Sequence, residues 1–136
     1  MTKKTPVIST LKPLKLSELS GVTIYPLHGQ KLRRGVPQEV LVVVEPNGRI
    51  PLHSHETDAY MTITGGSGIV LSTEPEGNLV EVKPGNCVFY EKFKMHGFRA
   101  GPQGLAFISR NGGIVAEKGQ SDIVFDRDLR MASGVW

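Results

Sequence analysis

Three residues of one short segment, His53, His55 and Asp58, have side chains of the kind that bind a divalent metal ion. The chain has 4 histidines, and two of them are separated here by a single residue. In a β-strand, side chains at positions i and i+2 point to the same face about 7 Å apart, so both imidazoles can turn towards one point. Neutral imidazoles and a carboxylate suit transition metals. On this segment alone, two solvent-facing histidines on an ordinary strand are an equal alternative.

A third histidine, His96, adds a second segment to the metal hypothesis. It follows a turn, a strand-like run over residues 87–90 and a loop, and it directly precedes a further strand-like pair at residues 97–98. In an antiparallel barrel, this pair could lie opposite the strand with the other two histidines. The set then suits Fe(II), Mn(II), Ni(II), Cu(II) or Zn(II), held on rigid strands. His28 has no paired ligand and fits a surface histidine.

Short strand-like runs separated by turns make up most of the sequence. Its 16 glycines and 9 prolines supply the positive or preset φ angles that tight turns require. Helical periodicity is scarce, and Pro13 interrupts the best helical candidate. Many short strands at close spacing are typical of an antiparallel sandwich or barrel. The strands that we expect cover residues 22–25, 39–45, 59–64, 68–72, 79–82, 87–90, 105–109, 114–116 and 123–125.

The run after Asp58 alternates between polar and apolar residues. If this run is a strand, Tyr60 shares the face of Asp58, and Met61 and Ile63 take the opposite face. A polar face that lines a concave interior would place the hydroxyl of Tyr60 near the metal. An ordinary strand with one face in solvent gives the same alternation, so both orientations stay open.

Aromatic residues and the single cysteine belong to the expected interior. We expect Phe89, Phe98 and Phe107 to line the barrel together with Tyr60. Cys87 begins an apolar run and fits a buried thiol better than a nucleophile. One cysteine excludes a disulfide within the chain and is typical of a cytoplasmic protein.

Two segments resemble the motifs of the cupin superfamily. GRIPLHSHETDAYMTITG, at residues 48–65, is similar to the first cupin motif, with a glycine, His-X-His, an acidic residue and a closing glycine. PGNCVFYEKFKMH, at residues 84–96, resembles the second motif, with a glycine turn, a strand and one histidine. The resemblance implies an all-β double-stranded β-helix, which is a jelly roll with a pocket at the barrel mouth.

The resemblance also implies a set of metal ligands. These are His53, His55 and His96, with Asp58 standing where the family usually has a glutamate. The acid is one residue closer to the histidine pair than usual, and its side chain is one methylene shorter. Both differences reduce how far the carboxylate of Asp58 extends towards the metal. Binding through water, or no binding, is therefore an alternative for Asp58. Glu56 is the second candidate, although it adjoins His55 and has the wrong parity for a strand.

The second motif departs from the family pattern around its loop. Residues 91–95, EKFKM, replace the usual Pro-X-Gly, and Asn86 replaces an aspartate. Glu91 and Lys92 could shape or charge the rim of the pocket. Arg99, just past the third histidine, could hold a carboxylate or phosphate through paired hydrogen bonds, or could be a plain surface charge.

The ligand pattern leaves three functions open. In the first, a metal-dependent enzyme of the oxygenase, isomerase or lyase type acts on a small molecule, with Tyr60, Glu91 or Arg99 as acid, base or anchor. In the second, the same metal site binds or senses a small molecule or sugar without turnover. In the third, the barrel is structural and its pocket is empty. The fold does not decide between them, because function depends on the pocket.

The distribution of charge argues against nucleic-acid binding, and the hydropathy argues against a membrane span. Residues 1–35 have seven Lys and Arg against one acid, but only Tyr25 could stack on bases. No apolar run approaches the roughly 20 residues of a membrane helix, and no secretory signal is recognisable. We therefore expect a cytoplasmic protein, with residues 1–20 as a basic arm or edge strand and residues 21–136 as one barrel domain. Trp136 favours packing on a second copy, so we expect a homodimer.

Overall fold

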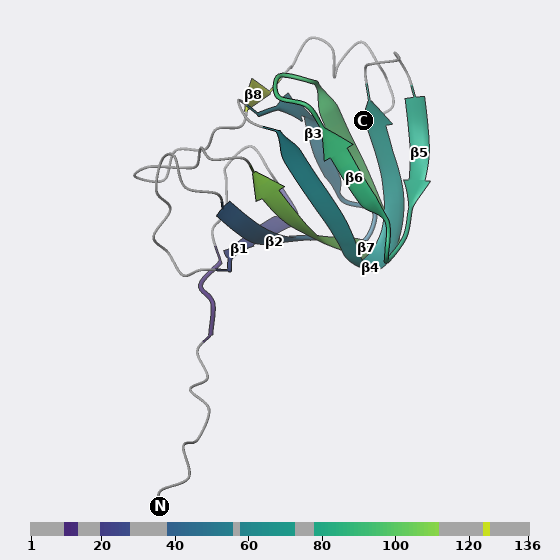
Figure 1. Ribbon diagram of the computed structural model, residues 1–136. Coiled ribbons are helices and arrows are strands. Elements are labelled where there is room, and N and C mark those ends of the chain that lie inside the picture. The colour runs from purple at the N-terminus through teal and green to yellow at the C-terminus, as the bar shows by residue number, and fades with distance from the viewer. Residues whose placement is uncertain are drawn as a thin grey trace, which may run out of the picture.

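The computed structural model describes residues 10–13, 20–27, 38–55, 58–72, 78–111 and 124–125. In these ranges all regular structure is β-strand, which confirms the all-β prediction (Figure 1). His28, Glu56, Trp136 and the expected strand at 114–116 lie outside the described residues. No helix of the described part is long and apolar enough to cross a membrane. The strands are β1 (Val22–Pro26), β2 (Gln38–Val44), β3 (Arg49–Ser54), β4 (Ala59–Ser72), β5 (Asn78–Val82), β6 (Cys87–Tyr90), β7 (His96–Asn111) and β8 (Val124–Phe125).

Two long strands, β4 and β7, pair antiparallel and run through both halves of the barrel. In one half, the strand order is β1-β2-β7-β4-β6, because β2 pairs with the end of β7 and β6 pairs with the start of β4. In the other half, the order is β8-β3-β7-β4-β5. Figure 1 shows the strands curving around a shared interior. This arrangement is the expected double-stranded β-helix.

The bend of β4 between the two halves depends on glycine. The sequence predicts separate strands over 59–64 and 68–72, but the structure has one strand with register shifts around its glycines. Gly66 and Gly104, on β4 and β7, have φ angles of 69° and 84°. A Cβ on Gly66 would clash with the carbonyl oxygen of Gly104, because the two backbones approach closely. The prediction of two strands was wrong, because glycines bend a continuous strand where they were expected to end it.

The same correction applies to β7. The sequence predicts a strand over 105–109 after a turn at 100–104, with a separate strand-like pair at 97–98. The structure instead has one strand from His96 to Asn111, and residues between Ala100 and Leu105 have no register partner on β4. The expected turn is an irregularity within the strand, so β7 carries residues of both halves.

Buried side chains from both halves form one core. In β4, alternate residues face inwards, which matches the period of two that a strand imposes. Burying one such large apolar side chain stabilises the fold by about 1.5–3 kcal/mol. The core consists of Val22, Ile24, Val42, Val44, Ile50, Ala59, Met61, Ile63, Val70, Val82, Tyr90, Phe98, Ala100, Leu105 and Phe107.

Three residues expected inside the barrel lie on its outer face. Tyr60 and Phe89 are 50% and 47% exposed, and their ring centroids lie 4.8 Å apart. Cys87 is exposed as well, so the prediction of a buried thiol was wrong. Phe98 and Phe107 are buried, as expected. The polar face of β4 is therefore its solvent face, because the intervening residues supply the inward side chains.

Candidate metal centre

Three buried histidines come together within the described residues: His53, His55 and His96. Their side chains are 4%, 7% and 1% exposed, in that order. Each offers one ring nitrogen, and these three nitrogens lie within 4.8 Å of one another. The distances between ring centroids are 5.0, 4.4 and 5.4 Å. Histidines from distant parts of the sequence thus form one cluster, as the metal hypothesis requires.

Strand pairing positions two of the three histidines. His53 on β3 is the register partner of His96 on β7, and Ile50 is the partner of Phe98. Three steps along β3 thus match two steps along β7, so β3 contains a bulge between Ile50 and His53. The bulge restores the inward direction, because His53 would otherwise point to the opposite face from Ile50. His55 follows directly after the last residue of β3.

Backbone carbonyls fix the orientation of two imidazoles. Nδ1 of His53 donates to the carbonyl oxygen of Pro51 at 2.7 Å, and Nδ1 of His96 donates to that of Lys94 at 2.9 Å. A carbonyl oxygen can only accept, so the proton of each neutral ring lies on Nδ1 and the lone pair on Nε2. This is the arrangement in which a second-shell carbonyl orients a metal-binding histidine.

Burial keeps these two imidazoles neutral. Desolvation lowers the pKa of His53 well below 6.5, and the nearby His96 and His55 lower it further. Desolvation is also the main reason why the pKa of His96 falls to about 3, followed by the proximity of His55. The hydrogen bonds to the carbonyls oppose these shifts without cancelling them. Near neutral pH both rings are uncharged and offer a lone pair.

The Nε2 atom of His96 provides the test of whether a cation fits the cluster. It is buried and has no hydrogen-bond partner in the described part of the chain. Leaving such a group unsatisfied costs about 1–3 kcal/mol. A divalent metal ion would satisfy this nitrogen, and three imidazoles are a known ligand set for such an ion. The residues present therefore fit a mononuclear metal site.

Tyr90, the last residue of β6, packs flat against the cluster. Its ring centroid lies 4.0 Å from that of His96, with an angle of 10° between the planes. Phe98 meets the same histidine edge-on at 6.1 Å. Burial raises the pKa of the Tyr90 hydroxyl above its usual value, so the hydroxyl stays protonated and can donate. The sequence reasoning missed Tyr90, although its parity opposite to Phe89 in β6 was an available signal.

Asp58 contacts the loop beside the cluster. Its side chain is exposed, and its Oδ1 accepts a hydrogen bond from the backbone N–H of Lys92 at 3.0 Å. The next N–H, that of Phe93, donates to the carbonyl oxygen of His55 at 2.7 Å. These two bonds tie the loop between β6 and β7 to the segment after β3. Among the described residues, Asp58 is not grouped with the three histidines.

None of the three residues expected as acid, base or anchor belongs to the group of buried histidines. Tyr60 is on the outer face of β4. Glu91 is exposed in the loop after β6, where its carbonyl oxygen accepts from the N–H of Lys94. Arg99 lines a separate cavity, on the opposite face of β7 from His96.

Solved structures of known proteins have the same fold. A cupin-2 domain from Rhodospirillum rubrum is 18% identical and covers 97% of this chain and 86% of its own, with a TM-score of 0.70. The polyketide cyclase RemF from Streptomyces resistomycificus is 21% identical, with coverages of 87% and 89% and a TM-score of 0.64. The DMSP lyase DddQ from Ruegeria pomeroyi is 15% identical, with coverages of 85% and 60% and a TM-score of 0.68.

The comparison by sequence gives a different result, since no family model and no curated protein matches the chain. At identities of 14% to 22%, likeness to solved structures concerns the fold. The strand order, the bent β4 and β7, and these structures together lead to one conclusion: the chain has the double-stranded β-helix fold of the cupins.

Proposed function

We propose that this protein is a mononuclear metal enzyme that acts on a small organic molecule, with His53, His55 and His96 as the protein ligands. The observation that carries the proposal is the buried, unpartnered Nε2 of His96, which belongs to a group of three ring nitrogens within 4.8 Å. The ion is a divalent transition metal. Imidazole ligands favour Fe, Ni, Zn or Cu, and they favour Mn less because Mn prefers oxygen ligands.

Three neutral imidazoles leave the full double positive charge on the ion. A carboxylate ligand would reduce that charge, but the hydrogen bond of Asp58 to Lys92 favours a different role for Asp58. When bound, such an ion acts as a Lewis acid on a carbonyl or carboxylate oxygen, or binds dioxygen, at the positions that the protein leaves open. Chemistry of this kind suits a substrate with an oxygen-bearing polar group.

The surrounding residues have their own roles in this proposal. Tyr90 donates a hydrogen bond to a substrate oxygen, because its hydroxyl stays protonated. The ring of Tyr90 and that of Phe98 exclude water from one side of the cluster. Asp58 acts as a positioning residue, since it anchors the loop that precedes His96.

The reaction class is supported by proteins of the same fold. One of them is a polyketide cyclase and another is a DMSP lyase, and both act on small organic molecules. We therefore propose lyase, cyclase or isomerase chemistry ahead of oxygenase chemistry. The alternative is a binding or sensing protein with the same metal site and no turnover. The buried aromatic residues beside the cluster suit a bound small molecule in either case.

Metal content tests the first part of the proposal. Elemental analysis of freshly purified protein is expected to give about one transition-metal ion per chain. The His53→Ala and His96→Ala variants are expected to lose it, and His28→Ala, which changes the histidine outside both motifs, is expected to keep it. Unchanged metal content in His53→Ala and His96→Ala would refute the metal site.

Turnover assays then separate enzyme from binding protein. The metal-loaded protein is incubated with a panel of small acids, lactones and sugars while products and dioxygen uptake are followed. Product formation without dioxygen uptake supports lyase, cyclase or isomerase chemistry, whereas stoichiometric uptake indicates an oxygenase. Saturable binding without product from any bound compound would favour the binding alternative. The expected homodimer is a separate prediction, which sedimentation velocity would check.

A further inference from the structure

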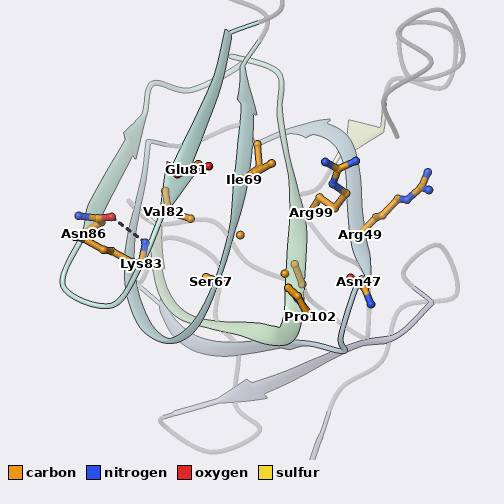
Figure 2. A pocket seen from close by; sticks show the side chains of 13 residues that line it. Asn47, Arg49, Ser67, Ile69, Glu81, Val82, Lys83, Asn86, Arg99 and Pro102 are labelled. Atoms are coloured by element: carbon orange, nitrogen blue, oxygen red, sulfur yellow. Dashed lines mark hydrogen bonds between the residues drawn. The ribbon is translucent and has the colours of Figure 1, made fainter.

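A cavity lies on the outer face of the half formed by β3, β7, β4 and β5. Its volume is about 770 Å³. Arg99 lines this cavity. His96 and Phe98 point to the interior of the barrel, and Arg99 points outward because successive side chains of a strand alternate between its faces. The cavity is therefore separated from the histidine cluster by the sheet itself. Figure 2 shows its lining side chains.

Two arginines on neighbouring strands line this cavity. Arg49 on β3 is the register partner of Arg99 on β7. Like charges directly opposite each other in a sheet are destabilising. The described residues supply no ion-pair partner for either guanidinium group. An anion bound between the two strands would compensate for this repulsion.

The two ends of the cavity have different lining residues, with the arginines at one end and Glu81 at the other. Figure 2 shows both guanidinium groups on one side of Ile69 and Glu81 on the other side. The register confirms this order, since Ile69 pairs with both Arg99 and Glu81. At about 4.8 Å per strand, Glu81 lies roughly 10 Å from Arg99 across the sheet. A ligand that extends from the arginines therefore meets the apolar side chain of Ile69 and then the polar end of the lining, with Glu81 and Lys83 (Figure 2).

We propose that this cavity is a binding site for a small molecule that carries a phosphate or carboxylate group at one end and hydroxyl or amino groups at the other. Arg49 and Arg99 bind the oxyanion through paired N–H groups, which match the geometry of both anions. Asn47, which lies near Arg49, and Ser67, which is on the same strand as Ile69, also line the cavity and supply further hydrogen bonds (Figure 2). Glu81 accepts from the hydroxyl or amino groups. This site is independent of the proposed metal enzyme.

Calorimetric titration at constant ionic strength tests the proposal. The protein is treated with a chelator first, so that no probe can bind a metal ion. The probes are glycerol 3-phosphate and glycerate, which share hydroxyl groups and differ in the anion, and neutral glycerol. Saturable binding of one or both anions, and none of glycerol, is expected. The anion that binds more tightly identifies the group for which the site is built.

Three variants assign the binding to the arginine pair. Arg49→Gln and Arg99→Gln are each expected to weaken binding about 10- to 100-fold, the loss that one charged hydrogen-bonding group gives. Arg99→Lys keeps the charge and is expected to restore only part of the affinity, because an ammonium group cannot make the paired contact. Arg110→Gln is the matched control, since Arg110 is also on β7 but forms an ion pair with Glu39 at 2.9 Å.

The outcomes distinguish this site from the metal centre. A His96→Gln variant that still binds the anion, while Arg99→Gln does not, supports a separate site whatever the metal content. Absence of saturable binding to the unmodified protein would overturn the proposal. Equal affinities in Arg49→Gln, Arg99→Gln and Arg110→Gln would overturn it as well. Far-ultraviolet circular dichroism of each variant verifies that the fold is retained.

Discussion

His53 and His96 lie directly opposite each other on β3 and β7, and the same kind of hydrogen bond orients both imidazoles. In each case Nδ1 donates to the backbone carbonyl oxygen two residues earlier in the chain, Pro51 for the first and Lys94 for the second. The backbone therefore fixes the tautomer before any ion arrives. Little reorganisation is needed on binding, which favours metal affinity.

The stability of the chelator-treated protein is expected to fall as the pH is lowered from about 6.5 to about 3. Burial lowers the pKa of His96 to about 3 and that of His53 well below 6.5. In this interval the unfolded chain binds more protons than the folded chain, so stability rises with pH. Each histidine contributes a slope of up to about 1.4 kcal/mol per pH unit. This contribution is fully present above pH 6.5.

Urea unfolding at a series of pH values measures that slope. The His96→Gln variant is the comparison, because glutamine does not titrate. It is expected to show a smaller slope between pH 6.5 and 4 than the unmodified protein. Identical slopes would mean that His96 does not remain neutral in the folded state.

Asp58 is expected to position the loop and not to bind the metal. Asp58→Asn keeps an acceptor oxygen for the N–H of Lys92, whereas Asp58→Ala removes it. Both variants are therefore expected to retain about one metal ion per chain, and Asp58→Ala alone is expected to lose stability, by about 0.5–1.5 kcal/mol. Metal titration and urea unfolding measure the two effects. A drop in metal affinity of tenfold or more in Asp58→Asn would identify Asp58 as a ligand.

Tyr90 is expected to affect catalysis through its hydroxyl and stability through its ring. Tyr90→Phe keeps the contact with His96 and is expected to preserve metal content while lowering turnover of a substrate that the hydroxyl contacts. Tyr90→Ala removes a buried ring and is expected to cost about 3–5 kcal/mol, as for other large aromatic residues. Thermal unfolding and product formation provide the readouts. Equal turnover of the unmodified protein and Tyr90→Phe would exclude the hydroxyl from the reaction.

The sequence predicts the histidine cluster well because its signal is local and repeated. His53 and His55 share a strand-like segment, and the resemblance to a second motif adds His96. The role of Asp58 depends on a contact with Lys92 across 34 residues, which no local pattern contains. Tyr60 was ambiguous for a physical reason, since strand alternation gives two faces but does not say which one is buried. Packing in three dimensions decides that question.

Gly66 is the residue on which the bend of β4 depends most. Its φ is 69°, and an added Cβ would clash with the backbone carbonyl of Gly104, so Gly66→Ala requires both strands to move. Gly85 has φ 94°, but its Cβ would meet nothing within 4 Å, and Gly65 has only an ordinary contact at 3.6 Å. The loss of stability is therefore expected to be largest for Gly66→Ala, intermediate for Gly85→Ala and smallest for Gly65→Ala. For Gly85→Ala we expect a loss of about 1 kcal/mol, from backbone strain alone. Urea unfolding of the three variants measures this order, and an equal loss for Gly66→Ala and Gly85→Ala would show that β4 and β7 can separate at the bend without cost.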